Sequence, residues 1–356
     1  MAELAHSCRV TEPGFIVLDE GPTGRMRLPK MLSHAADAPL LLVAGNRIEA
    51  WRLVPLLRAL RNSRDGGGAL LVDAGRGDEV GAALRELGMA ADLRLGSHRR
   101  LPALTFSLHR LVRRVSPSMM VAGGGSLSAL ACGLAAKSLA IPSTVLDCAV
   151  DGTPLWRWRA LSMLFTWILT GSEVPSPCGR TRRLGDPLFD LYREQAAATA
   201  SNGAQRSDLV VWDERTLDDP LACMRRLSAT QFEWIDAPAG AALSGLRRLG
   251  ALPHWRRLAL IRRATVIVTD HRLTAFQARW LARVVVWTGA NAAPAGCLQS
   301  TPEELPRTIA QALNGALAPL PLLEDGRAAP RLAAALRERV ESRAFAGWLT
   351  QFRTRA

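Results

Sequence analysis

Charged residues at the end of the first strongly apolar segment are the clearest candidates for chemistry in this chain. Residues 40–60 read LLLVAGNRIEAWRLVPLLRAL, in which Gly45, Arg47 and Glu49 separate five apolar residues from a helix-periodic stretch. Open α/β sheets bind ligands just past the carboxyl ends of their strands. A guanidinium in that place suits a phosphate, and a carboxylate suits a proton or a hydroxyl group. The alternative is a glycine turn with solvated charges, where Glu49 only complements a helix N-terminus.

A glycine-rich turn, GGGS at residues 123–126, is a second candidate. Glycines after an apolar segment expose backbone N–H groups at a helix start, where a phosphate can be held. The turn lacks the lysine of a P-loop and the spacing of a dinucleotide fingerprint, so a tight strand-to-helix turn explains it equally well. The histidines and cysteines show no metal-ligand spacing, so we predict no metal site and no cofactor.

The composition limits the classes of protein that fit. The chain has 356 residues, of which 48% are hydrophobic and 22% charged, a balance typical of globular domains. Its net charge is +13 and nearly all its cations are arginine, which either form solvated surface or bind anions. No apolar run approaches the roughly 20 residues that cross a bilayer, and the N-terminus has no signal-peptide pattern, so we expect a cytoplasmic protein. The single tyrosine and the lack of a nucleic-acid-binding motif argue against nucleic acid as a partner.

From residue 40 onward, short apolar segments alternate with amphipathic ones, a pattern typical of strand–helix units around parallel sheets. The pattern is interrupted by a polar, low-complexity stretch at 192–207 and then restarts. We interpret the chain as two Rossmann-like α/β domains whose parallel sheets face a cleft, which is the GT-B architecture. The predicted parts are an N-terminal arm (1–38), a first domain (39–191), a linker (192–207), a second domain (208–330) and a C-terminal helix that crosses back to the first domain (331–356).

The opening motif resembles that of the UDP-N-acetylglucosamine 2-epimerase family. That family usually has Gly-Thr-Arg-Pro-Glu followed by a periodic helix, and the matching positions here are Gly45, Arg47, Glu49, Pro55, Leu56 and Leu60. Further segments in register with the family are 117–136, 141–149, 182–191 and 266–273. The resemblance covers about residues 40–320, and it implies a GT-B fold and a sugar-nucleotide ancestor.

The acidic groups that the family's chemistry needs are largely replaced. Removing the proton next to the anomeric carbon takes carboxylates that act as acid and base. The family's His-Gly-Asp turn corresponds to Gly123, Gly124 and Gly125, and its Pro-Glu-Glu segment to Pro-Leu-Trp at 154–156. The glutamate of its His-Val-Glu-Ala-Gly motif corresponds to Asp147, the only surviving candidate for a catalytic carboxylate. The resemblance thus implies that 2-epimerase chemistry has been lost, because a shortened acid is poorly positioned.

The nucleotide-binding positions of the family are kept unevenly. The family holds UDP with the arginine of its first motif and with groups of the second domain. Its Ser-Gly-Gly after a second-domain strand corresponds here to 271–273, His-Arg-Leu, whose bulk hinders the approach of a diphosphate to the helix N-terminus. The resemblance implies UDP or a UDP-sugar as the ligand. The binding positions that it implies are Gly45, Arg47, Glu49, Arg52, Gly124, Gly125, Arg215, Asp270, Arg272 and Gln277.

Residues 155–169, LWRWRALSMLFTWIL, depart most from the family. Arginines between tryptophans ahead of an apolar helix are the composition of an interfacial membrane anchor. A peripheral contact through Trp156 to Trp167, at the inner face of a membrane, is therefore one hypothesis. The alternative is a core helix whose tryptophans pack between domains or across a homodimer or heterodimer interface. Arginine doublets in the second domain, such as Arg225-Arg226, could meet lipid, an acidic partner or only water.

Three functions fit these observations. The first is a binding or scaffold subunit in surface-polysaccharide or nucleotide-sugar metabolism that no longer catalyses 2-epimerisation. The second is an active glycosyltransferase, epimerase or hydrolase of altered mechanism, which would act on a sugar nucleotide with Asp147, Arg47, Arg215 and Arg272. The third is a membrane-surface binder. Binding of a UDP-sugar separates the first two from the third, and turnover separates the first from the second.

Overall fold

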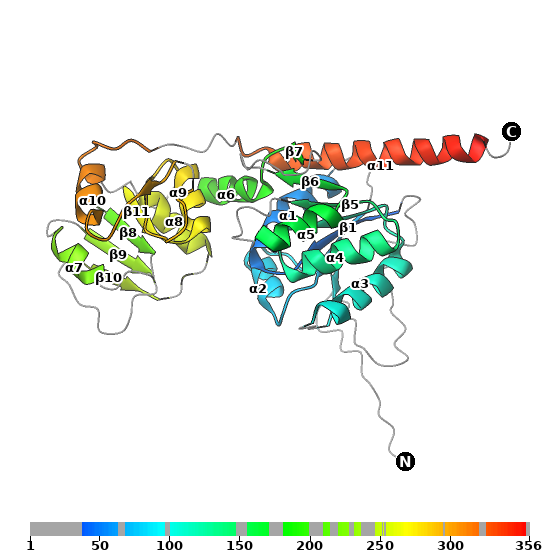
Figure 1. Ribbon diagram of the computed structural model, residues 1–356, viewed down its shortest axis with the longest axis horizontal. Helices are drawn as coiled ribbons and strands as arrows, with labels where there is room; N and C mark the ends of the chain where they lie inside the picture. The colour runs from blue at the N-terminus through cyan, green and yellow to red at the C-terminus, as the bar shows by residue number, and fades with distance from the viewer. Residues whose placement is uncertain are drawn as a thin grey trace, which may run out of the picture. The chain divides into compact units, whose positions relative to one another are not determined.

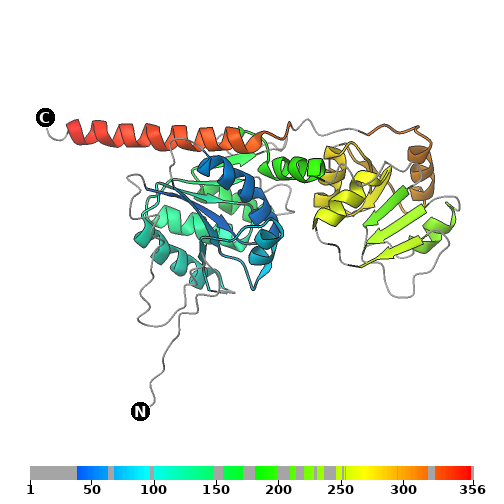
Figure 2. The ribbon, with the colours of Figure 1, turned by 180° about the vertical axis from the view of Figure 1, so that it is seen from behind.

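The computed structural model divides the chain into two compact units. The first unit consists of the residues up to Leu191 and from Gly326 onward, and the second of Tyr192–Asp325. Figures 1 and 2 show each unit as a parallel sheet covered by helices. The structure describes residues 38–62, 68–96, 100–146, 155–170, 181–198, 209–213, 220–227, 231–235, 246–250, 252, 254–294, 296–319 and 325–353.

Seven parallel strands form the sheet of the first unit, in the order β3-β2-β1-β4-β5-β6-β7. At its centre, Leu41 lies in register with Leu70 on one side and with Met120 on the other. The central strands are buried along their whole length, because helices cover both faces of the sheet. The strands are β1 (Leu40–Ala44), β2 (Ala69–Asp73), β3 (Leu93–Arg94), β4 (Met119–Ala122), β5 (Ser143–Leu146), β6 (Trp167–Thr170) and β7 (Thr181–Arg183).

Helices of the first unit begin where the sequence supplies caps. Asn46 accepts the N–H of Glu49 at 2.9 Å at the start of α1, and Ser126 accepts the N–H of Ala129 at 3.3 Å at the start of α4. Helices α3, α4 and α5 lie over one face of the sheet (Figure 1), and α1 lies over the opposite face (Figure 2). The helices are α1 (Arg47–Arg61), α2 (Glu79–Glu86), α3 (Leu101–Val115), α4 (Leu127–Ser138), α5 (Leu155–Leu164) and α11 (Ala328–Arg353). Helix α6 (Pro187–Ala198) begins in this unit, and its residues from Tyr192 onward belong to the second.

The C-terminal helix α11 packs on the first unit against α1. Arg337 donates a hydrogen bond to the carbonyl of Ala59 at 3.2 Å. The buried carboxylate of Asp190 accepts the N–H groups of Ala328 and Ala329 at 3.0 and 2.6 Å. This carboxylate complements the positive end of the helix dipole, so α11 begins at Ala328, three residues before the predicted start.

Six parallel strands form the sheet of the second unit, in the order β10-β9-β8-β11-β12-β13. This order is the same as that of the first six strands of the other sheet. In both sheets the chain adds its first three strands toward one edge, and it then crosses back and adds the later strands toward the other edge. Separate apolar clusters lie on the two faces. The elements are β8 (Leu209–Asp213), α7 (Pro220–Arg225), β9 (Gln231–Ile235), β10 (Leu246–Leu249), α8 (His254–Arg263), β11 (Val266–Thr269), α9 (Arg272–Trp280), β12 (Val284–Trp287), β13 (Leu298–Gln299) and α10 (Leu305–Leu313).

The predicted α/β class with two parallel sheets is confirmed. Besides the start of α11, two boundaries differ. The second unit ends at Asp325 rather than at residue 330. Helix α6 runs to Ala198, so residues 192–198 are helical rather than part of a linker. Tyr192 supplies the physical reason, since its side chain is buried and its hydroxyl accepts a hydrogen bond from Gln277 at 2.7 Å. No helix within the described ranges has both the length and the apolar content for a bilayer span. The predicted N-terminal arm falls on residues 1–37, outside the described part, and on residue 38.

Candidate functional site

The turns after β1 and β4 meet at the point where the strand order of the first sheet reverses, which is where α/β sheets of this kind bind ligands. Here the two turns are packed directly against each other. A Cβ atom on Gly45 would lie 2.4 Å from the Ser126 hydroxyl oxygen, and one on Gly123 would lie 2.9 Å from the Cβ of Glu49. Only glycine fits at either position, because the protein's own atoms fill the space.

Glu49 joins these two turns from the first helical turn of α1. Its Oε2 accepts the N–H of Gly45 at 2.6 Å and the hydroxyl of Ser126 at 3.0 Å, and its Oε1 accepts the N–H of Ser126 at 3.0 Å. The residue is fully buried. Because Ser126 is the N-cap of α4, this carboxylate supplies the anion at the positive end of that helix. Glu49 is therefore an internal anion, and it already accepts the backbone N–H of Ser126 at the start of α4.

Arg52 is also internal. Its Nε and Nη2 donate to Oδ1 and Oδ2 of Asp186 at 2.9 and 3.1 Å, and its Nη1 donates to the carbonyl of Gly123 at 2.7 Å. Both side chains are buried, and Asp186 also accepts the N–H of Leu188 at the start of α6. The structure thus places Arg52 in a buried bidentate ion pair that joins α1 to the segment after β7. Its guanidinium contacts protein groups on every nitrogen.

Arg47 is the charged residue of the opening motif that reaches the surface. Its side chain is 37% exposed, its Nη2 lies 3.7 Å from a carboxylate oxygen of Glu86, and its guanidinium lies 5.4 Å from the ring centre of Trp51. Gly124 and Gly125 are buried in the turn after β4, where the carbonyl of Gly125 accepts a hydrogen bond from Arg157 at 3.3 Å. At this edge of the first sheet, Arg47 is thus a surface cation that a ligand could approach.

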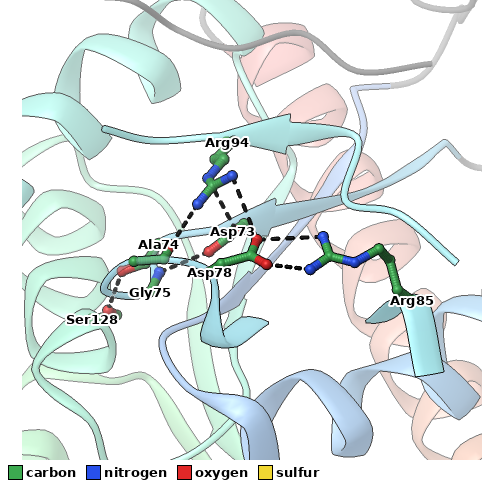
Figure 3. A network of polar contacts seen from close by, with 8 residues as sticks. Asp73, Ala74, Gly75, Asp78, Arg85, Arg94 and Ser128 are labelled. Carbon is green, nitrogen blue, oxygen red and sulfur yellow. Dashed lines mark hydrogen bonds and ion pairs between the residues drawn. The ribbon is translucent and has the colours of Figure 1, made fainter. Parts of the chain in front are cut away.

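Sequence reasoning missed one carboxylate, Asp73. It is the last residue of β2, and the residues that follow it lie beside Gly45 and Ser128 (Figure 3). Its Oδ1 accepts the N–H of Gly75 at 2.9 Å, and its Oδ2 lies 3.5 Å from Nε of Arg94. Arg94 also approaches Asp78, which in turn pairs with Arg85. Burial raises the pKa of Asp73, and the Gly75 N–H and the charge of Arg94 oppose this rise. A carboxyl with a raised pKa can hold a proton. The sequence feature that could have identified Asp73 is its position at the end of an apolar strand.

The corresponding edge of the second sheet carries another carboxylate that the sequence did not single out, Asp213 at the end of β8. It is 1% exposed, and its Oδ2 accepts the hydroxyl of Thr274 at 2.6 Å and lies 3.6 Å from Nη1 of Arg257. Its buried Oδ1 has no hydrogen-bond partner in the described part of the chain. Thr274 belongs to the first turn of α9, so this carboxylate also lies at a helix N-terminus.

Three predicted binding residues of the second unit lie between the end of β11 and the middle of α9. Asp270 follows β11 and lies 3.7 Å from the imidazole of His271, whose backbone N–H donates to the hydroxyl of Thr269 at 2.9 Å. Arg272 is the first residue of α9. Gln277 is buried, and its side-chain nitrogen donates to the hydroxyl of Tyr192. Gln277 thus faces a tyrosine of the protein, which leaves Asp270 and Arg272 as the predicted residues beside Asp213.

Two predicted residues, Asp147 and Arg215, lie outside the described residues. Within the described ranges, no group of three or more His, Cys, Asp or Glu side chains could hold a metal ion. Burial raises the pKa of Cys223 to about 12 and that of Cys297 to about 11, so these thiols are neutral and poor nucleophiles at pH 7.

Solved structures share this fold over most of the chain. A Listeria monocytogenes protein assigned as a UDP-N-acetylglucosamine 2-epimerase matches with a TM-score of 0.69 at 14% identity, covering 86% of this chain and 98% of the other. The UDP-GlcNAc 2-epimerase of Neisseria meningitidis bound to UDP-GlcNAc matches with a TM-score of 0.65 at 14% identity, covering 84% and 100%. MurG of Acinetobacter baumannii matches with a TM-score of 0.56 at 12% identity, covering 84% and 99%.

No family model and no curated protein sequence matches the chain. The predicted resemblance to the UDP-GlcNAc 2-epimerases is confirmed at the level of the fold, which is the GT-B fold that these enzymes share with MurG.

Proposed function

We propose that this protein has lost 2-epimerase chemistry and acts as a binding or scaffold subunit in surface-polysaccharide or nucleotide-sugar metabolism. The observation that carries the proposal is the internal position of Glu49. Its carboxylate is hydrogen-bonded to Gly45 and Ser126 at the point where the strand order of the first sheet reverses. The fold shared with UDP-GlcNAc 2-epimerases supports the link to sugar nucleotides.

The chemistry of epimerisation supports the same proposal. An acid and a base must reach the carbon next to the anomeric centre of a bound sugar. The turn after β4 offers only glycines, and the carboxylate of Glu49 is committed to three hydrogen bonds inside the protein. Asp73 is held by Gly75 and Arg94. A carboxylate that bonds the protein on both oxygens must break those bonds before it can act on a ligand.

A turnover assay tests the proposal directly. The purified protein is incubated with UDP-GlcNAc, and UDP-ManNAc and free UDP are measured. We expect neither product. Formation of either product would contradict the proposal and favour an active enzyme of altered mechanism, and Asp73→Asn and Asp147→Asn would then identify the acid that it uses.

A UDP-sugar is the first ligand to test, because relatives have been solved with UDP-GlcNAc and, in Staphylococcus aureus MnaA, with UDP. Isothermal titration with UDP and UDP-GlcNAc is compared between the natural protein, Arg47→Ala and, as a control, the exposed Arg307→Ala. For a scaffold we expect dissociation constants above about 1 mM, which is less than about 4 kcal/mol of binding free energy. Micromolar binding that only Arg47→Ala abolishes would instead indicate a retained nucleotide site.

A second candidate function, binding to an anionic membrane surface, is favoured by the face formed by α3, α4 and α5. These helices lie side by side (Figure 1) and contain no Asp or Glu. Exposed cations on them are Arg110, Arg113, Arg114, Lys137 and Arg159. Exposed apolar side chains are Phe106, Leu134, Trp156 and Met163, with exposed fractions of 62%, 37%, 61% and 70%.

Aromatic and other apolar side chains among cations are typical of surfaces that insert into the interface of an anionic bilayer. A second copy of the chain would bring the same positive charge to this face, and like charges disfavour self-association. We therefore propose the membrane surface, rather than a homodimer, as the partner of the α3–α5 face.

Vesicle co-sedimentation tests this second proposal. We expect binding to vesicles of phosphatidylglycerol and phosphatidylcholine, little binding to pure phosphatidylcholine, and loss of binding in Trp156→Ala/Met163→Ser. The control is Trp255→Ala, which removes an exposed tryptophan from α8 in the second unit. Failure to bind anionic vesicles, together with a dimer in light scattering that Trp156→Ala/Met163→Ser dissociates, would show that this face is a protein interface instead.

A further inference from the structure

The carboxyl edge of the second sheet has the layout of an anion site. The strand order reverses between β8 and β11, where Asp213 pairs in register with Thr269. Helix α9 begins three residues after Thr269, and its N-cap, His271, makes no side-chain capping hydrogen bond. In sheets with this order, a ligand lies past the strand ends and its phosphates approach a helix N-terminus.

The protein places its own carboxylate in that position. Asp213 is 1% exposed, and it accepts a hydrogen bond from Thr274, in the first turn of α9, at 2.6 Å. Its negative charge complements the positive end of the helix, as a bound phosphate would. Arg257, at 3.6 Å from the same oxygen, offsets part of this charge.

A second carboxylate at this edge acts in the same sense. Asp270, at the end of the neighbouring strand, adds a second carboxylate that is largely buried. Two carboxylates against a diphosphate would be like charges in a poorly solvated place, and such contacts strongly disfavour binding. Arg272 at the first position of α9 and Arg257 would oppose this repulsion, and Arg257 already contacts Asp213.

The other oxygen of Asp213 defines which ligand groups would be accepted. Its Oδ1 is buried and has no hydrogen-bond partner among the described residues. Buried polar atoms in folded proteins are nearly always hydrogen-bonded, so an unpaired carboxylate oxygen at a ligand-binding edge favours a ligand that donates a hydrogen bond.

We propose that Asp213 determines ligand specificity in the second unit: it closes the carboxyl edge of this sheet to a diphosphate and selects a ligand group that donates a hydrogen bond, a sugar hydroxyl. Asp213 is here a binding residue and not a catalytic one. The proposal goes beyond the function proposed above, because it concerns the second unit and does not depend on whether the first unit retains an acid or a base.

Uridine and UDP are the probes that test it, because they share a base and a ribose and differ only in the diphosphate. Isothermal titration with each is carried out on the natural protein, Asp213→Asn and Asp213→Ser. The asparagine keeps the shape of the side chain and removes its charge, and the serine covers the case in which the asparagine variant does not fold. The control is Glu233→Gln, which removes another largely buried carboxylate, paired with Arg247 within β9 and β10.

We expect the natural protein to bind UDP no more tightly than uridine. Removing the charge of Asp213 should raise the affinity for UDP relative to uridine by about tenfold or more, which corresponds to 1.4 kcal/mol of binding free energy. Glu233→Gln should leave that ratio unchanged.

Two results would overturn the proposal. One is a natural protein that binds UDP at least tenfold more tightly than uridine. The other is a pair of folded Asp213 variants, verified by thermal denaturation, whose ratio of UDP to uridine affinity equals that of the natural protein. If both folded variants bind neither UDP nor uridine, the proposal is also overturned. Removing the charge of Asp213 would then not have admitted the diphosphate.

Discussion

The carboxyl edges of the two sheets have the same strand order and contain buried carboxylates at equivalent places, but the two carboxylates are satisfied to different degrees. Glu49 lies at the N-terminus of α4 and accepts three hydrogen bonds from the two turns around it. Asp213 lies at the N-terminus of α9 and leaves one buried oxygen without a partner in the described chain. A fully paired buried carboxylate stabilises the fold, whereas an incompletely paired one is available to a ligand.

The largest expected difference between the two edges concerns their arginines. Arg52→Ala should destabilise the first unit by about 3–5 kcal/mol, because it leaves the buried charge of Asp186 without its bidentate partner. Arg257→Ala should cost the second unit less, about 1–3 kcal/mol, because the contact of Arg257 with Asp213 is longer, 3.6 Å, and Asp213 keeps its hydrogen bond from Thr274. Urea unfolding of both variants measures this difference, and equal losses would contradict the comparison.

The next largest difference in stability should come from the hydrogen bonding of the two buried carboxylates, Glu49 and Asp213. Glu49→Gln places an amide N–H₂ among the donors of Gly45 and Ser126 and should cost about 1–3 kcal/mol, because at least one buried donor then has no acceptor. Asp213→Asn retains an acceptor for Thr274 and should cost about 1 kcal/mol or less. Urea unfolding measures both losses. A larger loss of stability for Asp213→Asn than for Glu49→Gln would contradict the difference described between the two edges.

The direct packing of the first-unit turns can be tested at Gly45. Gly45→Ala should cost about 1–3 kcal/mol, because the added methyl group would lie 2.4 Å from Ser126 and 2.5 Å from Ser128, closer than these atoms can approach without a shift. The matched control is Gly68→Ala, whose methyl group would lie 3.7 Å from Pro39, an ordinary contact. Thermal denaturation that showed equal effects for both substitutions would mean that the turns are not packed as described.

The smallest expected effect is the pH dependence that Asp73 contributes. Its pKa is raised in the folded protein, so the folded state binds this proton more tightly than the unfolded state does. Protonation therefore favours folding, and the first unit should lose stability as pH rises from the unfolded value of 3.8 through the raised folded value. Asp73→Asn should remove this loss at pH values above 3.8 in urea unfolding. An identical pH profile for the variant would show that Asp73 is not the group responsible.

Much of the fold could be predicted from the sequence because it depends on local patterns. Apolar runs such as 40–44 form buried parallel strands, and Asn46 and Ser126 cap helices that they immediately precede. Residues 192–198 of the predicted linker are helical, because Arg193 and Glu194 are exposed on a helix that Tyr192 itself anchors in the interior.

The candidate site was less predictable, because the function of a charged residue depends on partners far away in the chain. Arg47, Glu49 and Arg52 lie within six positions and had been grouped as ligand-binding residues. The structure separates them into one surface cation and two buried groups. Asp73 and Asp213 were missed, since a single carboxylate at the end of an apolar strand has no distinctive spacing.

Local sequence patterns are enough to predict the α/β class, the alternation of strands and helices and the resemblance to a sugar-nucleotide family, because these rest on residues a few positions apart. The roles of the charged groups depend instead on contacts that form when the chain folds. Glu49 bonds Ser126 across 77 positions of the chain, and Arg52 bonds Asp186 across 134. Burial and pairing set the behaviour of a charge, and both are properties of the packed chain rather than of its local sequence.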